Sequence, residues 1–203
     1  MDAILEAVLA AADPQPALSW IDVGCGRGEL LRKVRDRWRP TRLVGIDPID
    51  WLDEDLRGDV EFAKLPAEHA GELAPADRVL LVEVIEHLEA PWTALRAAAR
   101  LVAPSGLLAL STPNVTTLRH RLELALRGRL TSFRPDNVPH TTPALPHVSA
   151  RILAEEGLRV QPPRFAGADV IPGSGGRLWP EPLRRRCASL TSVSVIIAAR
   201  RDL

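Results

Sequence analysis

A glycine-rich loop at the end of a short apolar strand is the feature that most constrains the fold of this chain. Residues 18–23 form an apolar run that ends at Gly24-Cys25-Gly26-Arg27-Gly28, and residues 29–38 follow with helical periodicity. Glycine at a strand-to-helix turn lets the backbone adopt positive φ and approach a ligand closely. The segment therefore predicts the first strand and helix of an α/β fold, with a ligand site at the turn.

The rest of the chain repeats this alternation of short apolar strands and helices. We expect further strands at residues 43–46, 60–62, 78–82, 107–111, 158–160 and 191–199. Helices are expected near the N-terminus and at residues 91–101, 117–127 and 149–156. The alternation predicts a mostly parallel sheet flanked by helices, and no repeat or linker divides the chain into two domains.

The composition excludes several classes of protein. The 203 residues are 46% hydrophobic, and 26 basic side chains balance 26 acidic ones, so bulk attraction to nucleic acid or to an anionic membrane is not expected. Cys25 and Cys187 form neither a disulfide framework nor a metal-binding pair. The first residues lack the basic region of a secretory signal, and no apolar run approaches the roughly 20 residues of a membrane span. We expect a cytoplasmic protein.

Acidic residues mark the ends of the first two strands. Asp22 precedes the glycine loop, where its charge suits a ligand with a cationic amine. Asp47 ends the second strand, where a carboxylate can accept two hydrogen bonds from a ribose diol. Glu29 stands where the dinucleotide fingerprint requires glycine or alanine. The spacing therefore disfavours a nicotinamide-dependent oxidoreductase.

These motifs resemble those of class I S-adenosylmethionine-dependent methyltransferases. The resemblance rests on VGCGRGELL, on GIDP and on LVEVIEHLEAPWTALRAAARLVAPSGLLALSTPN, and it runs from Trp20 through the final strand. It implies an α/β, Rossmann-like sheet of seven mostly parallel strands with helices on both faces. It also implies one domain over residues 1–203, with a variable substrate lid at about 115–148. The implied contacts to S-adenosyl-L-methionine are Asp22, Gly24, Gly26, Gly28, Asp47, Pro48, Ile49, Lys64, Leu65 and Glu83.

A cluster of acids and a histidine follows the fourth strand. If residues 83–87 turn helical, Glu83, Glu86 and His87 share one face of the helix and could hold Mg²⁺, Mn²⁺ or Zn²⁺. The spacing E-x-x-E-H resembles the metal-binding element of methyltransferases that act on small RNAs or in ubiquinone biosynthesis. That resemblance implies a further ligand after the fifth strand, for which His140 is the best match and His120 and His147 are reserves.

The same residues are the candidates for catalysis. A cation would lower the pKa of an acceptor hydroxyl and fix its geometry. Without a metal, His87 or His140 could act as general base, and Glu86 completes the predicted catalytic set. The opposing interpretation is that the glutamates cap a helix and the histidines line a pocket without binding a metal.

The acceptor is the least constrained part of the function. Arg119, Arg121, Arg127, Arg129 and Arg134 make residues 119–134 basic, which favours an anionic acceptor or only a solvated surface. Our first hypothesis is methyl transfer to an oxygen of a small molecule, with nitrogen or carbon acceptors less favoured. The alternatives are 2′-O-methylation at the 3′ end of a small RNA and a non-catalytic protein that binds S-adenosylmethionine. The sequence does not indicate the oligomeric state.

Overall fold

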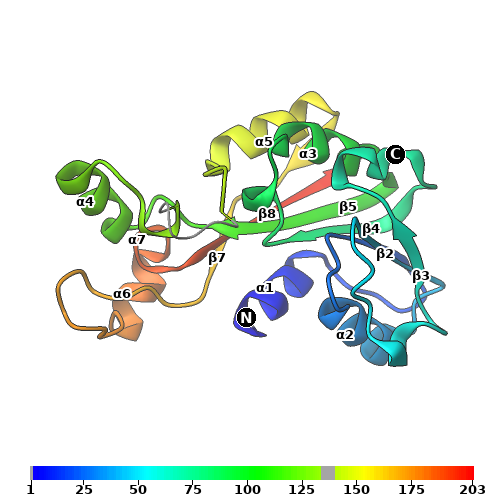
Figure 1. Ribbon diagram of the computed structural model, residues 1–203, viewed down its shortest axis with the longest axis horizontal. Coiled ribbons are helices and arrows are strands. Elements are labelled where there is room, and N and C mark those ends of the chain that lie inside the picture. The colour runs from blue at the N-terminus through cyan, green and yellow to red at the C-terminus, as the bar shows by residue number, and fades with distance from the viewer. Residues whose placement is uncertain (1, 134–139) are drawn as a thin grey trace.

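The computed structural model describes residues 2–133 and 140–203, which form one twisted sheet with helices on both sides (Figure 1). The strands are β1 (Ser19–Val23), β2 (Arg42–Asp47), β3 (Glu61–Lys64), β4 (Ala76–Val82), β5 (Val102–Pro113), β6 (Leu158–Val160), β7 (Arg164–Ala166) and β8 (Ser194–Arg201). The helices are α1 (Asp2–Ala11), α2 (Glu29–Trp38), α3 (Pro91–Arg100), α4 (Leu118–Arg127), α5 (Pro146–Glu155), α6 (Glu181–Arg186) and α7 (Ala188–Thr191). The short 3₁₀ segments within the described residues are η1 (Glu54–Leu56), η2 (Ala67–Glu72), η3 (Ile85–His87) and η4 (Thr131–Phe133).

The order of the strands confirms the predicted Rossmann-like architecture. The sheet runs β3-β2-β1-β4-β5-β8-β6, and the pairs among β1 to β5 are parallel. The last long strand, β8, lies antiparallel to β5. The carboxyl ends of β1, β2 and β4 therefore meet at one edge of the sheet, where α/β proteins of this kind bind their ligands.

The outer edge of the sheet contains a strand that the sequence did not predict. Both β6 and β7 pair antiparallel with β8, β6 near Arg201 and β7 near Ser194. Between them lie Pro162 and Pro163, which have no backbone N–H to donate to a ladder. The prolines thus divide the edge strand beside β8 into two short strands, β6 and β7. The sheet therefore has eight strands, although only seven lie side by side across it, as predicted.

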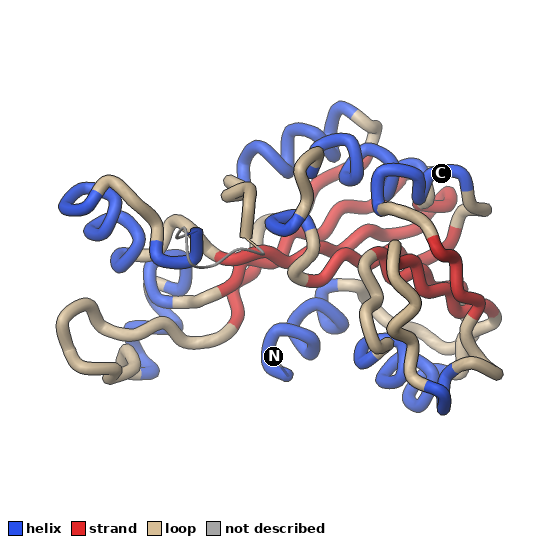
Figure 2. The backbone as a smooth tube through the Cα atoms, viewed as in Figure 1, coloured by secondary structure: helices blue, strands red, loops and turns tan. Residues whose placement is uncertain are grey.

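Two apolar cores lie on opposite faces of the sheet. On one face, η2, α3 and α5 pack against inward side chains such as Ile21 and Leu108. On the other face, α1 and α2 pack against side chains such as Trp20 and Ile196. Figure 2 shows the resulting three layers, with the strands running between the two sets of helices. Alternate residues of the strands point to opposite faces, so each buried strand supplies both cores.

A lobe projects beyond one end of the sheet. We use this name for residues 117–133 and 169–192, which include α4, α6 and α7 (Figure 1). The predicted helix at 117–127 is confirmed as α4, which begins after Thr117, whose hydroxyl accepts a hydrogen bond from the N–H of His120. Within the described residues, no helix is both long and apolar enough to span a bilayer.

Candidate active site

The glycine loop between β1 and α2 forms the centre of the site. Gly24 and Gly28 have φ of 78° and 85°, in the left-handed region that favours glycine. A Cβ atom at Gly24 would lie 2.5 Å from the side chain of Val84, and one at Gly28 would overlap Leu56. Gly24 therefore lets the loop approach the segment after β4, while Gly28 lets α2 pack against η1.

Asp47 fixes the loop to the end of β2. Its carboxylate accepts hydrogen bonds from the N–H of Gly26 at 3.1 Å and from the N–H of Ile49 at 3.0 Å. An ionised carboxylate has about four acceptor positions. Two of them thus remain for the paired hydroxyls of a ribose, which agrees with the predicted role of Asp47.

Two pockets meet at Gly24. The smaller, of about 230 Å³, contains Asp22 and residues of the glycine loop. The larger, of about 310 Å³, lies between the end of β2, the start of η2 and the segment that contains Glu83 and His87. Because Gly24 lines both pockets, an elongated ligand that crosses this glycine can place one end in each of them.

Asp22 is buried in the smaller pocket without a compensating partner. Only 3% of the residue is exposed, and its Oδ1 has no hydrogen-bond partner among the described residues. Burial, and then the charge of Asp47, raise the pKa of Asp22 to about 8. A buried carboxyl of this kind is a favourable partner for a cationic group, because the cation would restore the charge that burial disfavours.

The pockets include most of the predicted cofactor contacts. Those that line them are Asp22, Gly24, Gly26, Asp47, Pro48 and Glu83. Four other predicted contacts, Gly28, Ile49, Lys64 and Leu65, do not line either pocket. Gly28 has the packing role given above, and the side chains of Ile49 and Lys64 are exposed. These four assignments stay predictions without support from the pocket geometry.

Sequence reasoning missed three pocket-lining residues around the start of η2. Pro66, Ala67 and Glu68 line the larger pocket, in place of Lys64 and Leu65. Pro66 lies directly before η2, whose first residues turn back toward the end of β2. Glu68, which lies beyond the third strand, thus brings a carboxylate to this pocket. The signal available in the sequence was a proline followed two residues later by an acid.

Glu86, His87 and His140 form a cluster beside the larger pocket. One ligand atom from each residue lies within 4.8 Å of the others. The rings of His87 and His140 meet edge to face, with centroids 4.8 Å apart. His87 also lines the larger pocket. Three of the four predicted metal ligands are therefore together, at the side of the pocket where the segment after β4 lies.

Glu83 lies outside this cluster, contrary to the predicted ligand set. The prediction required residues 83–87 to form one helix with the three side chains on the same face. Only Ile85–His87 form a 3₁₀ turn, η3, and Glu83 lies before it with a left-handed φ of 54°. The Glu83 carboxylate accepts a hydrogen bond from Ser111 Oγ at 2.8 Å. The N–H of Glu83 donates to the Ser111 carbonyl at 3.2 Å. The structure thus directs Glu83 toward β5, while the residue still lines the larger pocket.

Glu86 is an unusual carboxyl because it is fully buried. One oxygen, Oε2, accepts a hydrogen bond from Thr112 Oγ1 at 3.2 Å, whereas Oε1 has no hydrogen-bond partner among the described residues. Burial, and then the charge of Glu83, raise the pKa of Glu86 to about 8. His87 Nε2 lies 3.9 Å from Oε1. A buried oxygen without a partner, facing an imidazole at this distance, fits a shared cation.

His140 reaches the cluster because the following threonines bind the backbone of the segment after β4. The Glu86 carbonyl accepts hydrogen bonds from the N–H of Thr141 at 2.8 Å and of Thr142 at 3.1 Å. Both hydroxyls donate to the Leu88 carbonyl. Burial, and then His87, lower the pKa of His140, which keeps its imidazole neutral and able to accept a proton or bind a metal.

The reserve histidines lie elsewhere. His120 is buried at the base of α4, and His147 is exposed on α5. Neither belongs to the cluster of ligand atoms found within the described residues.

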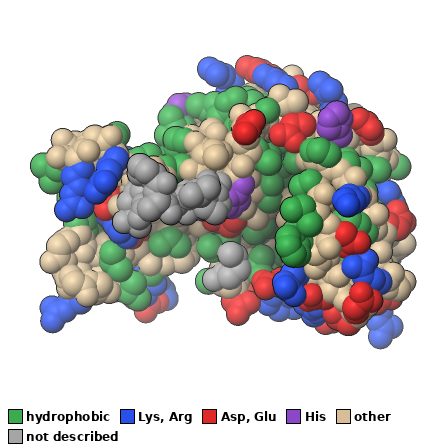
Figure 3. All heavy atoms as spheres, in the orientation of Figure 1, with side chains coloured by type: hydrophobic (Ala, Val, Ile, Leu, Met, Phe, Trp, Pro, Cys, Tyr) green, Lys and Arg blue, Asp and Glu red, His purple; other side chains and the backbone are tan. Residues whose placement is uncertain are grey.

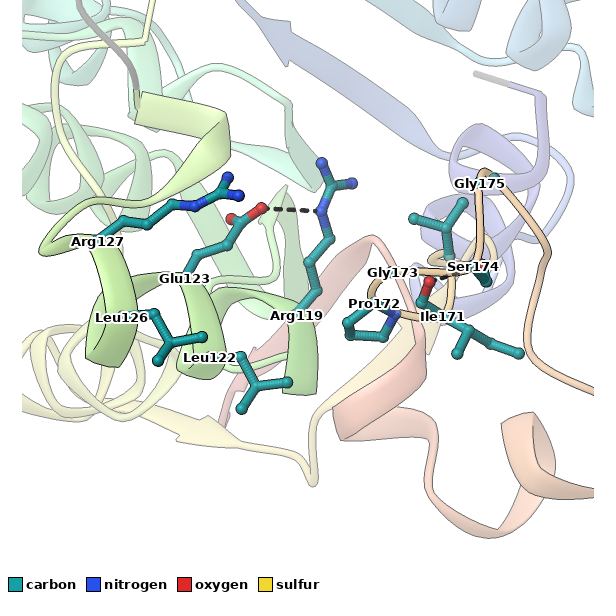
Figure 4. A pocket seen from close by; sticks show the side chains of 12 residues that line it. Arg119, Leu122, Glu123, Leu126, Arg127, Ile171, Pro172, Gly173, Ser174 and Gly175 are labelled. Carbon is teal, nitrogen blue, oxygen red and sulfur yellow. Dashed lines mark hydrogen bonds and ion pairs between the residues drawn. The ribbon is translucent and has the colours of Figure 1, made fainter.

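The lobe contains a further pocket of about 340 Å³, between α4 and residues 170–176 (Figure 4). Figure 3 shows basic side chains on the part of the lobe that carries α4, and all of them are arginine, because the lobe contains no lysine. Arg119 is already paired there with Glu123, at 3.2 Å, and with Asp169, at 3.7 Å. Of the predicted basic side chains, Arg127 also lines this pocket, and Arg134 lies outside the described residues.

Comparison with known proteins identifies the family. Residues 1–161, which make up most of the chain, match the family described as a methyltransferase domain. The protein belongs to the class I S-adenosylmethionine-dependent methyltransferases. The predicted family and fold class are thus confirmed.

This methyltransferase also resembles individual members of the class. It is 29% identical over 182 residues to the human mitochondrial ubiquinone biosynthesis O-methyltransferase, covering 83% of this chain and 48% of that protein. It is 27% identical over 195 residues to the ubiquinone biosynthesis O-methyltransferase of Burkholderia thailandensis, covering 93% and 80% of the two chains. The chain thus spans about half the length of the human relative.

The solved structures agree on the fold. A crystal structure of a SAM-dependent methyltransferase from Archaeoglobus fulgidus aligns with a TM-score of 0.66 and 17% identity, over 97% of this chain and 91% of that one. At this identity the likeness establishes the shared architecture alone.

Proposed function

We propose that this methyltransferase transfers the methyl group of S-adenosylmethionine to an oxygen of a small-molecule acceptor. The observation that carries the proposal is the position of Glu86, His87 and His140 beside the pocket that contains Asp47. A cofactor crossing Gly24 would present its methyl group near this cluster. An acceptor hydroxyl beside the cluster would then be placed for attack on the sulfonium methyl.

The residues that line the two pockets support one orientation of the cofactor. Its amine would lie in the smaller pocket against Asp22, whose carboxyl would gain a cationic partner. Its ribose would bind Asp47, and its adenine would lie between Pro48 and Ala67, with Glu68 able to accept a hydrogen bond from the exocyclic amine. In this arrangement the sulfonium would lie near Gly24, which lines both pockets.

We also propose that Glu86, His87 and His140 hold a divalent cation. One carboxylate oxygen and two imidazoles suit Mn²⁺ or Zn²⁺ better than Mg²⁺, which prefers an all-oxygen shell. The cation would supply a Lewis acid that lowers the pKa of the acceptor hydroxyl. Without the cation, the neutral imidazole of His140 could itself accept the hydroxyl proton.

The names of the relatives favour a hydroxylated aromatic ring as acceptor, since two of them are O-methyltransferases of ubiquinone biosynthesis. The basic residues of α4 give less support to an anionic substituent on the acceptor than the sequence suggested. Arg119 is already paired with Glu123 and Asp169, which neutralise its charge. The cytoplasmic location and the single domain over residues 1–203 also stay predictions.

Methyl transfer from radiolabelled S-adenosylmethionine tests the function. The purified protein is incubated with catechol, a carboxylated catechol, a primary amine and a short RNA, after chelation and with Mg²⁺, Mn²⁺ or Zn²⁺ restored. We expect label on a catechol oxygen, lost in His140→Ala and retained in His147→Ala, which removes an exposed histidine outside the cluster.

Different results would contradict the proposed acceptor and the proposed cation. Label only on the amine or the RNA would contradict the small-molecule O-acceptor. Equal rates on catechol before and after chelation would contradict the cation while leaving methyl transfer intact.

A further inference from the structure

His120 connects the end of β5, the base of α4 and η4 through the two nitrogens of its ring. Nδ1 lies 3.0 Å from the carbonyl oxygen of Asn114, at the end of β5, and 3.0 Å from the hydroxyl of Thr117. Nε2 lies 3.1 Å from Ser132 Oγ, in η4. Only 7% of His120 is exposed, so these bonds form largely away from water. The side chain thus ties η4 to the base of α4.

The partners fix which nitrogen of the neutral ring carries the proton. A carbonyl oxygen only accepts, so Nδ1 donates to Asn114. Nε2 is then the acceptor, and the Ser132 hydroxyl donates to it. Nδ1 therefore binds the backbone at the base of the lobe, and Nε2 binds η4.

The residues that His120 holds are those that contact His140. The ring of Phe133 lies 5.5 Å from the ring of His140. The backbone of Ser132 hydrogen-bonds to His140. A continuous set of contacts thus runs from His120 through Ser132 and Phe133 to the histidine at the active site. On its other side, His140 is followed by the threonines bound to Glu86 and Leu88.

We infer that His120 is a positioning residue, which holds η4 against His140 through the bond between Nε2 and Ser132 Oγ. His120 does not belong to the cluster of ligand atoms and acts on the acceptor only through η4 and His140. A second anchor of η4, the bond from the Thr131 N–H to Glu123 at 3.1 Å, keeps the start of η4 near α4 when His120 is changed. An effect of His120 on catalysis rests on the proposed function, in which His140 acts as a base or as a metal ligand.

Two substitutions separate the tasks of the two nitrogens. His120→Asn can place an amide N–H near the position of Nδ1 but has no acceptor at Nε2. His120→Gln can place its amide oxygen near Nε2 and so keep the bond from Ser132. Ser132→Ala removes the same bond from the other side.

The readout is the rate at which diethylpyrocarbonate modifies His140, measured by mass spectrometry of its peptide. The exposed His147 in the same molecule is the internal reference. One hydrogen bond of this kind corresponds to roughly a threefold to tenfold change in an opening equilibrium. We expect the ratio of His140 to His147 modification to rise about that much in His120→Asn and Ser132→Ala, and to stay near wild type in His120→Gln.

Two further measurements distinguish positioning from general destabilisation and from failure of the proposed function. Binding of S-adenosylhomocysteine should be unchanged in all three variants, and with an active acceptor kcat should fall in His120→Asn while KM for the cofactor stays constant. An unchanged His140 ratio in His120→Asn, or an equal rise in His120→Gln, would overturn the inference. The modification rates report on His140 even when no acceptor is methylated, so a failed function assay leaves this test intact.

Discussion

The imidazole rings of His87 and His140 meet edge to face at 4.8 Å, although one belongs to η3 and the other precedes α5. The contact depends on the bonds from Thr141 and Thr142 to the Glu86 carbonyl. The segment after β4 therefore serves both as the wall of the larger pocket and as the support for His140. In the proposed function, this one segment would contact both the cofactor and the acceptor.

Replacing Asp22 should change the pH dependence of stability in the absence of cofactor. Its pKa is about 8 in the folded protein against 3.8 ordinarily, so between these values the folded state retains a proton that the unfolded chain has released. The free energy of unfolding therefore falls as the pH rises through this window. From pH 4 to 8, the fall in the free energy of urea unfolding should be smaller in Asp22→Asn than in wild type by on the order of 5 kcal/mol, while Glu86, whose pKa is also raised to about 8, keeps its own contribution in both proteins. An identical pH slope in the two proteins would refute this assignment.

Cofactor binding should release a proton from the same carboxyl. Burial raises the pKa of Asp22 to about 8 in the free protein, and a cationic amine beside it would favour the ionised form. Affinity for S-adenosylhomocysteine should accordingly rise between pH 6 and 7.5. Calorimetry in buffers of different ionisation enthalpy should detect the released proton in wild type but not in Asp22→Asn. Binding without any proton release would place the amine elsewhere.

Gly24→Ala should destabilise the fold and weaken cofactor binding. The new methyl group would meet Val84 at 2.5 Å while the backbone keeps a φ of 78°. Left-handed strain together with overpacking costs about 2 to 4 kcal/mol. Denaturant unfolding measures the cost, and Gly58→Ala is the matched control, because a Cβ there meets nothing within 4 Å. A Gly24→Ala protein as stable as the control would show that the loop can move away from Val84.

Glu68→Ala and Lys64→Ala should differ in cofactor affinity. Glu68 lines the larger pocket, whereas the exposed Lys64 does not. Loss of one hydrogen bond to the adenine corresponds to roughly a threefold to tenfold weaker binding. Fluorescence or calorimetric titration should find this loss in Glu68→Ala alone. The reverse result would restore the contact at Lys64 that the resemblance implied.

The parts of the fold that the sequence predicted well are those with a clear period between glycine or proline boundaries. The expected helix at residues 29–38 matches α2, and β1, β2 and β4 lie within two residues of their predicted bounds. The strand expected at 107–111 extends to Val102–Pro113, because Pro104-Ser105-Gly106 bends the strand without ending it. Residues 188–191 form α7, so the last strand starts at Ser194 and not at 191.

The site was harder to predict where it depends on contacts between distant segments. Asp22, Gly24 and Asp47 follow from strand ends, because parallel strands bring their carboxyl ends to one edge. The relation of Glu83 to Glu86 depended on a helix that does not form, since Ser111 holds Glu83 in a left-handed conformation. The resemblance pointed to Lys64 at the end of the third strand, whereas Glu68, two residues after Pro66, lines the larger pocket.

The most direct test of the account is whether one molecule of S-adenosylhomocysteine occupies both pockets beside Gly24. Calorimetric titration should give one site per chain in wild type, at least tenfold weaker binding in Asp47→Ala, and unchanged binding in Gly58→Ala. The Asp47 change removes two loop hydrogen bonds as well as the ribose contact. Absence of binding in folded wild-type protein, or binding of NADH in its place, would contradict the central claim.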